Sequence, residues 1–230
     1  MNIIAIVFDF DGVITPRGEA LKEEAWERLI ANPAPEEGGD PEVFPRLLRE
    51  AREKYGQGKA RGSRYDILRE ALRGAFLYAG VELDGRIEFY ACEYNRHVQE
   101  MVLEDGLLTG TKETLEDLAS DFSLYVNSAT PRDAVRGSVE RLGLAHVFDD
   151  VLGMPGTKVE NLKEIAKREL VRDPEHILFV GDSSGDEKAA QEFGCRFVGV
   201  ANDRNCWEGK PYPLVRHLRE IRALLEEVHA

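Results

Sequence analysis

Small polar side chains follow three compact apolar runs of this sequence, and their types could bind a metal ion or an anion. They are Asp9 and Asp11 after IIAIVF (residues 3 to 8), Asn127 and Ser128 after FSLYV (122 to 126), and Asp182 after HILFV (176 to 180). Such runs are typical of strands that are buried on both faces of a parallel sheet. Because the carboxyl ends of these strands form the ligand-binding edge of an open α/β sheet, we expect the polar side chains to lie together.

Helix-start signals stand just beyond these positions. They are TPRD at 130 to 133, with Thr130 as the expected N-cap, and the capping-box patterns TKVE at 157 to 160 and SGDE at 184 to 187. Ser128 and Lys158 are therefore expected beside helix N-termini. Free backbone N–H groups and the positive end of the helix dipole bind anions there, phosphate most obviously.

Three aspartates would repel a phosphate unless a cation lay between them. Asp9, Asp11 and Asp182 together favour a hard cation such as Mg²⁺, which prefers one or two carboxylates with waters and phosphate oxygens. Turn chemistry is the alternative for the Asp-x-Asp-Gly pattern, since both residue types favour tight turns. Lys158 could likewise be an ordinary solvated lysine, and Asp186 a helix acid favoured by the dipole.

An alternation of strands and helices is predicted around these residues. A fourth apolar run, RFVGV, lies at 196 to 200, and amphipathic stretches typical of helices lie at 131 to 142, 157 to 170, 185 to 193 and 213 to 228. This order predicts an α/β core with a doubly wound, mostly parallel sheet.

The interval from residue 16 to 105 differs, because it contains helical periodicity and no convincing strand. Its helical stretches are EALKEEAWERLI, VFPRLLREAREKY and SRYDILREALRGAFLYA. The proline- and glycine-rich segment NPAPEEGGDPE at 32 to 42 predicts a loop between helices. We therefore predict a core domain of residues 1–15 and 106–230, interrupted by an all-helical domain of residues 16–105.

Composition argues against several classes of partner. The 230 residues include 43 acidic and 30 basic side chains, and the resulting net charge of -13 repels nucleic acids and anionic lipid. No apolar run approaches membrane-spanning length, and Cys92, Cys195 and Cys206 lack zinc-site spacing. We expect a soluble, cytoplasmic protein with reduced thiols, no nucleic-acid partner and no membrane partner, while the oligomeric state stays undefined.

Four motifs in order, FDFDGV, NSAT, GTK and GDSSGD, resemble those of the haloacid dehalogenase (HAD) superfamily, whose most numerous members are Mg²⁺-dependent phosphatases. The resemblance extends over residues 1 to 15 and 106 to 205, and the insert is similar to the helical cap of the subclass that contains phosphoglycolate phosphatase and β-phosphoglucomutase. The segment EDGLLTGTKETL departs from the family pattern, because many members have a proline-glycine pair before this helix.

The resemblance implies a role for each motif residue. Asp9 would be the nucleophile that forms an aspartyl-phosphate, and Asp11 the general acid and base. Ser128 and Lys158 would hold the phosphoryl group. Mg²⁺ would be bound by Asp182, by the carboxylate of Asp9 and by the main-chain oxygen of Asp11. We expect Asp186 to support these ligands from outside the metal's own shell.

The resemblance favours a phosphatase that acts on a small phosphorylated metabolite, and other functions share parts of the pattern. A phosphomutase of the β-phosphoglucomutase type uses the same residues and differs in how it protects the phosphoenzyme from water. A dehalogenase is disfavoured, because members with that chemistry lack the second aspartate, here Asp11. A receiver-like phosphoacceptor also combines acids, a hydroxyl, a lysine and Mg²⁺, but it has no long insert after its first strand.

Substrate recognition is predicted in the helical insert. Residues 46 to 73 carry nine basic and four acidic side chains, a local net charge of +5. A solvated helix face accounts for the part up to Lys54 at least as well as a binding site does. The segment GKARGSRYD contains loop-forming glycines and is similar to the cap loop that contacts the leaving group in related phosphatases. We predict that Arg61 or Arg64 contacts an anionic or hydroxyl-rich substrate.

Overall fold

The structure is a computed structural model that describes residues 3–31, 42–56, 63–75, 80–202, 205, 207 and 209–229. It divides into two compact units, which we call the core unit (Met1–Glu19 with Val102–Ala230) and the helical unit (Ala20–Met101). The use of the helical unit as a cap stays a prediction.

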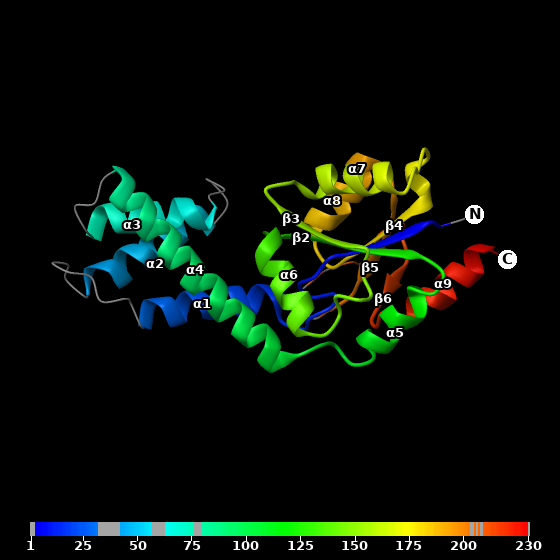
Figure 1. Cartoon of the computed structure of the whole chain (residues 1–230), viewed down its shortest axis with the longest axis horizontal. Helices are drawn as coiled ribbons and strands as arrows, with labels where there is room; N and C mark the ends of the chain where they lie inside the picture. Colours follow the sequence, from blue (N-terminus) through cyan, green and yellow to red (C-terminus); the bar gives the residue numbers. More distant parts are fainter. Residues whose placement is uncertain are drawn as a thin grey trace. The chain divides into compact units, whose positions relative to one another are not determined.

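The core unit is built on a parallel sheet with the strand order β3-β2-β1-β4-β5-β6 (Figure 1). Its strands are β1 (Ala5–Phe8), β2 (Ser123–Pro131), β3 (Asp150–Met154), β4 (Ile177–Gly181), β5 (Arg196–Val200) and β6 (Leu214–Val215). β1 lies between β2 and β4, and its Phe8 is level with both Val126 and Val180. The predicted doubly wound α/β fold is confirmed.

Helices cover both faces of this sheet (Figure 1). They are α5 (Thr111–Leu118), α6 (Arg132–Arg141), α7 (Lys158–Arg168), α8 (Ser184–Phe193) and α9 (Glu220–His229), with a 3₁₀ turn at Pro174–His176. Helices α7 and α8 pack against each other, and their apolar side chains join the core formed by Val7 and Phe179. On α9, Arg222 binds Asp117 of α5, with Nε and Oδ2 2.6 Å apart.

Two strands were not predicted, because their sequences lack a long apolar run. β3 begins at Asp150, whose carboxylate binds Arg132, Arg136 and Arg168, so a charged residue opens an otherwise buried strand. β6 has two residues and lies inside the stretch at 213 to 228 that we expected to be helical. That expectation is wrong for its first part, because α9 begins at Glu220.

Two of the expected helix starts also need correction. The N-cap position of α6 is Pro131 and not Thr130, and no side chain caps this helix. The capping box of α8 is formed by Ser183 and Asp186, one residue before the expected pattern. The third expectation is confirmed, since Thr157 caps α7 in a complete capping box.

The helical unit contains α2 (Val43–Gly56), α3 (Arg64–Ala75) and most of α1 (Gly18–Ala31) and α4 (Gly80–Asp105). Helix α2 packs against α3, and the rings of Phe44 and Tyr90 lie 4.8 Å apart in its buried interior. The helices expected in this interval are confirmed over their described residues. The last four residues of the third predicted stretch, 76 to 79, and nearly all of the predicted loop at 32 to 42 lie outside the described residues. Among the described helices, none is both long and apolar enough to cross a membrane.

Candidate active site

The end of β1 places Asp9 at the centre of the sheet. Its backbone N–H donates to the carbonyl oxygen of Val180 (2.9 Å), and the residue is only 6% exposed. Gly12 then turns the chain with φ +81°, and a Cβ atom at this position would lie 2.2 Å from Oδ2 of Asp182. Glycine is therefore needed both for the backbone angle and for the close approach of the Asp182 carboxylate.

Lys158 reaches Asp9 from the first position of α7. Its Nζ lies 2.9 Å from Oδ1 of Asp9 and also binds Oδ1 of Asp186. The backbone of this position is fixed as well, because Asn127 donates from Nδ2 to the carbonyl oxygen of Lys158 (2.9 Å), and Asn161 donates to Oδ1 of Asn127 (2.9 Å). Burial disfavours the lysine's charge, but the two carboxylates outweigh that effect and raise the pKa of Lys158.

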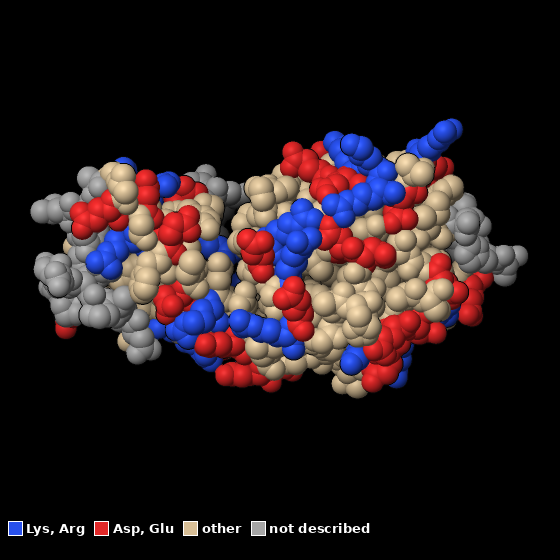
Figure 2. Space-filling view, viewed as in Figure 1, with Lys and Arg blue, Asp and Glu red and all other residues tan. Residues whose placement is uncertain are grey.

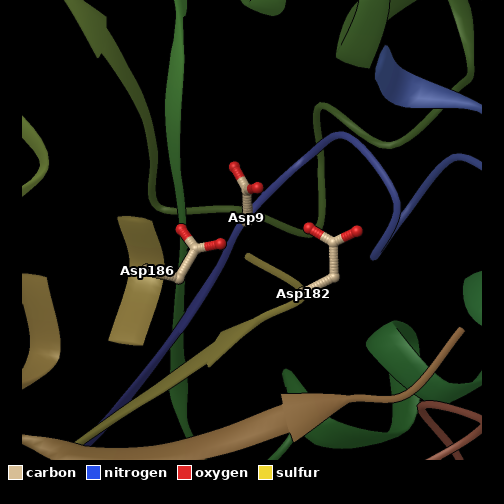
Figure 3. A group of neighbouring side chains, drawn as sticks. All are labelled: Asp9, Asp182 and Asp186. Atoms are coloured by element: carbon tan, nitrogen blue, oxygen red, sulfur yellow. The ribbon is translucent and has the colours of Figure 1, made fainter. Parts of the chain in front are cut away.

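Asp9, Asp182 and Asp186 form a cluster of carboxylates at this edge of the sheet. One oxygen of each lies within 4.8 Å of the others, and Figure 3 shows the three carboxylates grouped around the end of β1. Asp186 is fully buried and accepts hydrogen bonds at Oδ2 from the backbone N–H (3.0 Å) and the hydroxyl (2.5 Å) of Ser183. The capping box of α8 therefore holds one member of the cluster in place.

The charge balance of the cluster fits a hard cation. Among the described residues, Lys158 is the one basic side chain with an ion pair to this cluster, so the three carboxylates carry excess negative charge when they are ionised. Burial, together with the charges of Asp186 and Asp11, raises the pKa of Asp9 to about 7 against the opposing effect of Lys158. Burial and the charge of Asp186 also raise the pKa of Asp182. All-oxygen carboxylate donors that are short of positive charge are the kind of site that Mg²⁺ binds.

Asp11 and Ser128 both contact Thr130, and the charge of Asp11 also acts on Asp9 of the cluster. The hydroxyl of Thr130 is 3.5 Å from Oδ2 of Asp11, and the backbone N–H of Thr130 donates to Oγ of Ser128 (3.1 Å). Ser128 is buried within β2, two residues after the position that is level with Phe8. Thr130, which we expected only as a helix cap, thus links these two predicted site residues.

The sequence did not indicate that Asp186 lies within the carboxylate cluster or that Asn202 contacts this cluster. We expected Asp186 to support the metal ligands from outside; its carboxylate belongs to the cluster and binds Lys158 and Ser183, and its role stays a prediction. Asn202 was not predicted at all, and its Nδ2 donates to Oδ2 of Asp182 (2.9 Å). The roles assigned to Asp9, Asp11, Ser128, Lys158 and Asp182 stay predictions.

The two predicted substrate-binding arginines of the insert have different outcomes. Arg61 lies outside the described residues. Arg64 is partly buried in the helical unit, where its guanidinium lies 5.0 Å from the ring centre of Tyr94 and donates to Oδ1 of Asn95. Tyr94 in turn stacks on Trp26, with ring centres 4.5 Å apart. The contact of Arg64 with substrate stays a prediction.

Much of the basic run around Arg64 is paired with acidic side chains. Arg52 binds Glu23 and Glu27 of α1, and Lys54 binds Glu70 at 2.7 Å. Figure 2 shows basic and acidic residues interspersed over the visible faces of both units. These pairs favour the interpretation of the α2 part of the run as a solvated helix face.

Comparison with known proteins identifies the family. Residues 3–194 match the hydrolase family described as haloacid dehalogenase-like hydrolase. The chain belongs to this family. The phosphoglycolate phosphatase of Salmonella typhimurium is 28% identical over 227 residues, which cover 90% of this chain and 84% of the relative.

Two solved structures of HAD-like proteins have the same fold. The 2-haloacid dehalogenase of Pseudomonas syringae has a TM-score of 0.68 and 24% identity, with 98% of this chain and 99% of that chain covered. The β-phosphoglucomutase of Clostridium difficile has a TM-score of 0.64 and 20% identity, with 99% of this chain and 97% of that chain covered. The chain is therefore a HAD-like enzyme whose fold also occurs in proteins named for other reactions.

Proposed function

We propose that the protein is a Mg²⁺-dependent phosphatase that hydrolyses a small phosphorylated metabolite through an aspartyl-phosphate on Asp9. The observation that carries this proposal is the buried Asp9 carboxylate, 2.9 Å from the Lys158 ammonium and within a cluster that is short of positive charge. The similarity to the phosphoglycolate phosphatase of Salmonella typhimurium supports the choice of a phosphate ester as substrate. Mg²⁺ held by Asp9 and Asp182 would neutralise charge on the phosphoryl oxygens and leave them open to attack.

In the first step, an oxygen of the Asp9 carboxylate attacks phosphorus while the bond from phosphorus to the ester oxygen breaks. Lys158 holds Asp9 on one side, and its ammonium can stabilise negative charge on the phosphoryl group as this charge is redistributed. The hydroxyl of Ser128 can donate to a second phosphoryl oxygen. Asp11 in its protonated form donates to the leaving oxygen, so the alcohol leaves neutral.

In the second step, a water molecule attacks phosphorus and gives a proton to Asp11, which is now a carboxylate. The bond from phosphorus to the Asp9 oxygen breaks, inorganic phosphate leaves, and both aspartates return to their starting states. One general acid and base thus serves both steps. Thr130, 3.5 Å from Oδ2 of Asp11, is placed to orient this side chain.

The test is turnover of p-nitrophenyl phosphate by the full chain, before and after removal of metal with EDTA. We expect EDTA to abolish turnover and Mg²⁺ to restore it, while Asp9→Asn has none under either condition. Full turnover in metal-free buffer would refute the metal requirement. Absence of turnover with this ester and with a panel of phosphorylated metabolites would refute the phosphatase, and turnover that depends on an added sugar bisphosphate would indicate a phosphomutase instead.

A further inference from the structure

The segment that follows β5 binds Asp182 at two points. Asn202 donates from Nδ2 to the side-chain Oδ2 of Asp182 (2.9 Å), and Asn205 donates from Nδ2 to its main-chain oxygen (3.0 Å). The two asparagines also bind each other, because the backbone N–H of Asn202 donates to Oδ1 of Asn205 (3.1 Å). Both the backbone and the carboxylate of Asp182 are thus held by one short piece of chain.

This segment is itself attached firmly to the core unit. Asn205 and the indole N–H of Trp207 both donate to the carbonyl oxygen of Val200, at 2.7 and 3.1 Å. Lys210 forms an ion pair with Glu187 of α8, with Nζ 2.8 Å from Oε1. Contacts with Val200 and Glu187, in addition to those with Asp182, therefore hold the residues around Asn202 in place.

The consequence for Asp182 is that one carboxylate oxygen is already committed. Oδ2 receives the Asn202 amide and lies against Gly12, where even a Cβ atom would be only 2.2 Å away. Asp182 belongs to the same carboxylate cluster as Asp9, and Figure 3 shows one of its oxygens turned toward Asp9 and the other turned away. A neutral donor suits this place, because it fixes a carboxylate without adding a positive charge that would compete with a cation.

We propose that Asn202 is a positioning residue that sets the orientation of Asp182 for binding a divalent cation. This inference rests on the proposed function, which makes Asp182 a metal ligand. Removal of a residue that hydrogen-bonds a ligating carboxylate typically weakens metal binding about 10- to 100-fold. A loss of this size is expected here, because without the amide the Asp182 side chain can rotate away from the cluster.

The experiment measures Mn²⁺ binding to the full chain from the loss of the free Mn²⁺ signal in electron paramagnetic resonance, so it needs no turnover. The variants are Asn202→Ala and Asn202→Leu, which keeps the shape of the side chain but has no N–H donor. Lys210→Met is the matched control, since it loosens the same segment without touching Asp182. Thermal unfolding of each metal-free variant shows whether it is folded.

We expect both Asn202 variants to bind Mn²⁺ about 10-fold or more weakly than the parent, and Lys210→Met to stay within about twofold. Phosphatase turnover of the Asn202 variants should recover at saturating Mg²⁺, because their defect is in affinity. Folded Asn202 variants with parent-like Mn²⁺ affinity would overturn the proposal, and so would an equal loss in Lys210→Met. A parent protein that binds Mn²⁺ but turns over no phosphate ester would refute the phosphatase and leave the inference about Asn202 standing.

Discussion

Replacement of Asp9 by asparagine should stabilise the metal-free protein while it abolishes turnover. The pKa of Asp9 is raised from 3.8 to about 7 in the folded state, so the folded protein keeps this proton over a pH range in which the unfolded chain has lost it. A state that binds more protons is disfavoured as pH rises, and the free energy of unfolding therefore falls between about pH 4 and pH 7. Asparagine does not titrate, so the free energy of unfolding of the variant does not fall in this way as pH rises.

The size of the effect follows from the same pKa. A tenfold change in proton affinity corresponds to about 1.4 kcal/mol. The raised pKa of Asp9 therefore lowers the free energy of unfolding by about 4 kcal/mol at pH 8, where Asp9 is ionised, and by less than half of that at pH 5, where the folded protein keeps the proton. The free energy of unfolding of Asp9→Asn, relative to the parent, should therefore rise by about 2 to 3 kcal/mol from pH 5 to pH 8. Lys158 does not add to this pH dependence, because its pKa is raised in the folded parent and its ammonium stays protonated from pH 5 to pH 8.

Urea unfolding in EDTA at the two pH values measures this difference. The chain has two tryptophans, and a Trp26→Phe background leaves Trp207, which packs against Phe197 in the core unit, as the fluorescent probe. Mg²⁺ should then stabilise the parent at pH 8, by about 2.7 kcal/mol at 100 times its dissociation constant, and stabilise Asp9→Asn much less. A stability difference between Asp9→Asn and the parent that is the same at both pH values, or that falls as pH rises, would show that the pKa of Asp9 is not raised in the folded protein.

Two further substitutions test the catalytic and recognition roles. In Asp11→Asn the nucleophile remains but proton transfer is lost, a role typically worth about 10²- to 10⁴-fold in rate. Phosphoenzyme should therefore accumulate with p-nitrophenyl phosphate and appear as a phosphate adduct in the mass of acid-quenched protein. An adduct on Asp9→Asn would contradict the assignment. Arg64→Ala should impair turnover of the native substrate far more than turnover of p-nitrophenyl phosphate, and Arg69→Ala on the same helix is the control. Equal losses on both esters would indicate that Arg64 only supports the ring of Tyr94.

Most of the sheet could be predicted from the sequence, because its central strands are continuous apolar runs. The run at 196 to 200 matches β5 residue for residue, and the other three differ from their strands mainly at the ends. The edge strands were missed because an edge does not need an apolar run. β3 opens with Asp150, which three arginines bind, and β6 is formed by two residues that pair only with the end of β5.

The site residues that directly follow a strand in the sequence could be predicted. Asp9, Ser128 and Asp182 each follow an apolar run, so strand-end reasoning brings them to one edge without a structure. Strand-end reasoning could not identify Asn202, because this residue lies in a connecting segment whose position depends on the contacts of Trp207 and Lys210. Its contact with Asp182 is purely tertiary, and an asparagine in a loop is otherwise typical of turn chemistry.

The structure also shows why similarity of fold cannot choose among the reactions of this family. The chain has the fold of a dehalogenase and of a phosphomutase at nearly the same TM-score, so the choice depends on individual residues. Asp11 is one of them, and two glycines make room around this turn. A Cβ at Gly18 would lie 2.3 Å from Cβ of Asp11, and one at Gly12 would strike Asp182. Under the proposed function, the glycines at positions 12 and 18 leave room for Asp11, the acid that would protonate the leaving oxygen of an ester.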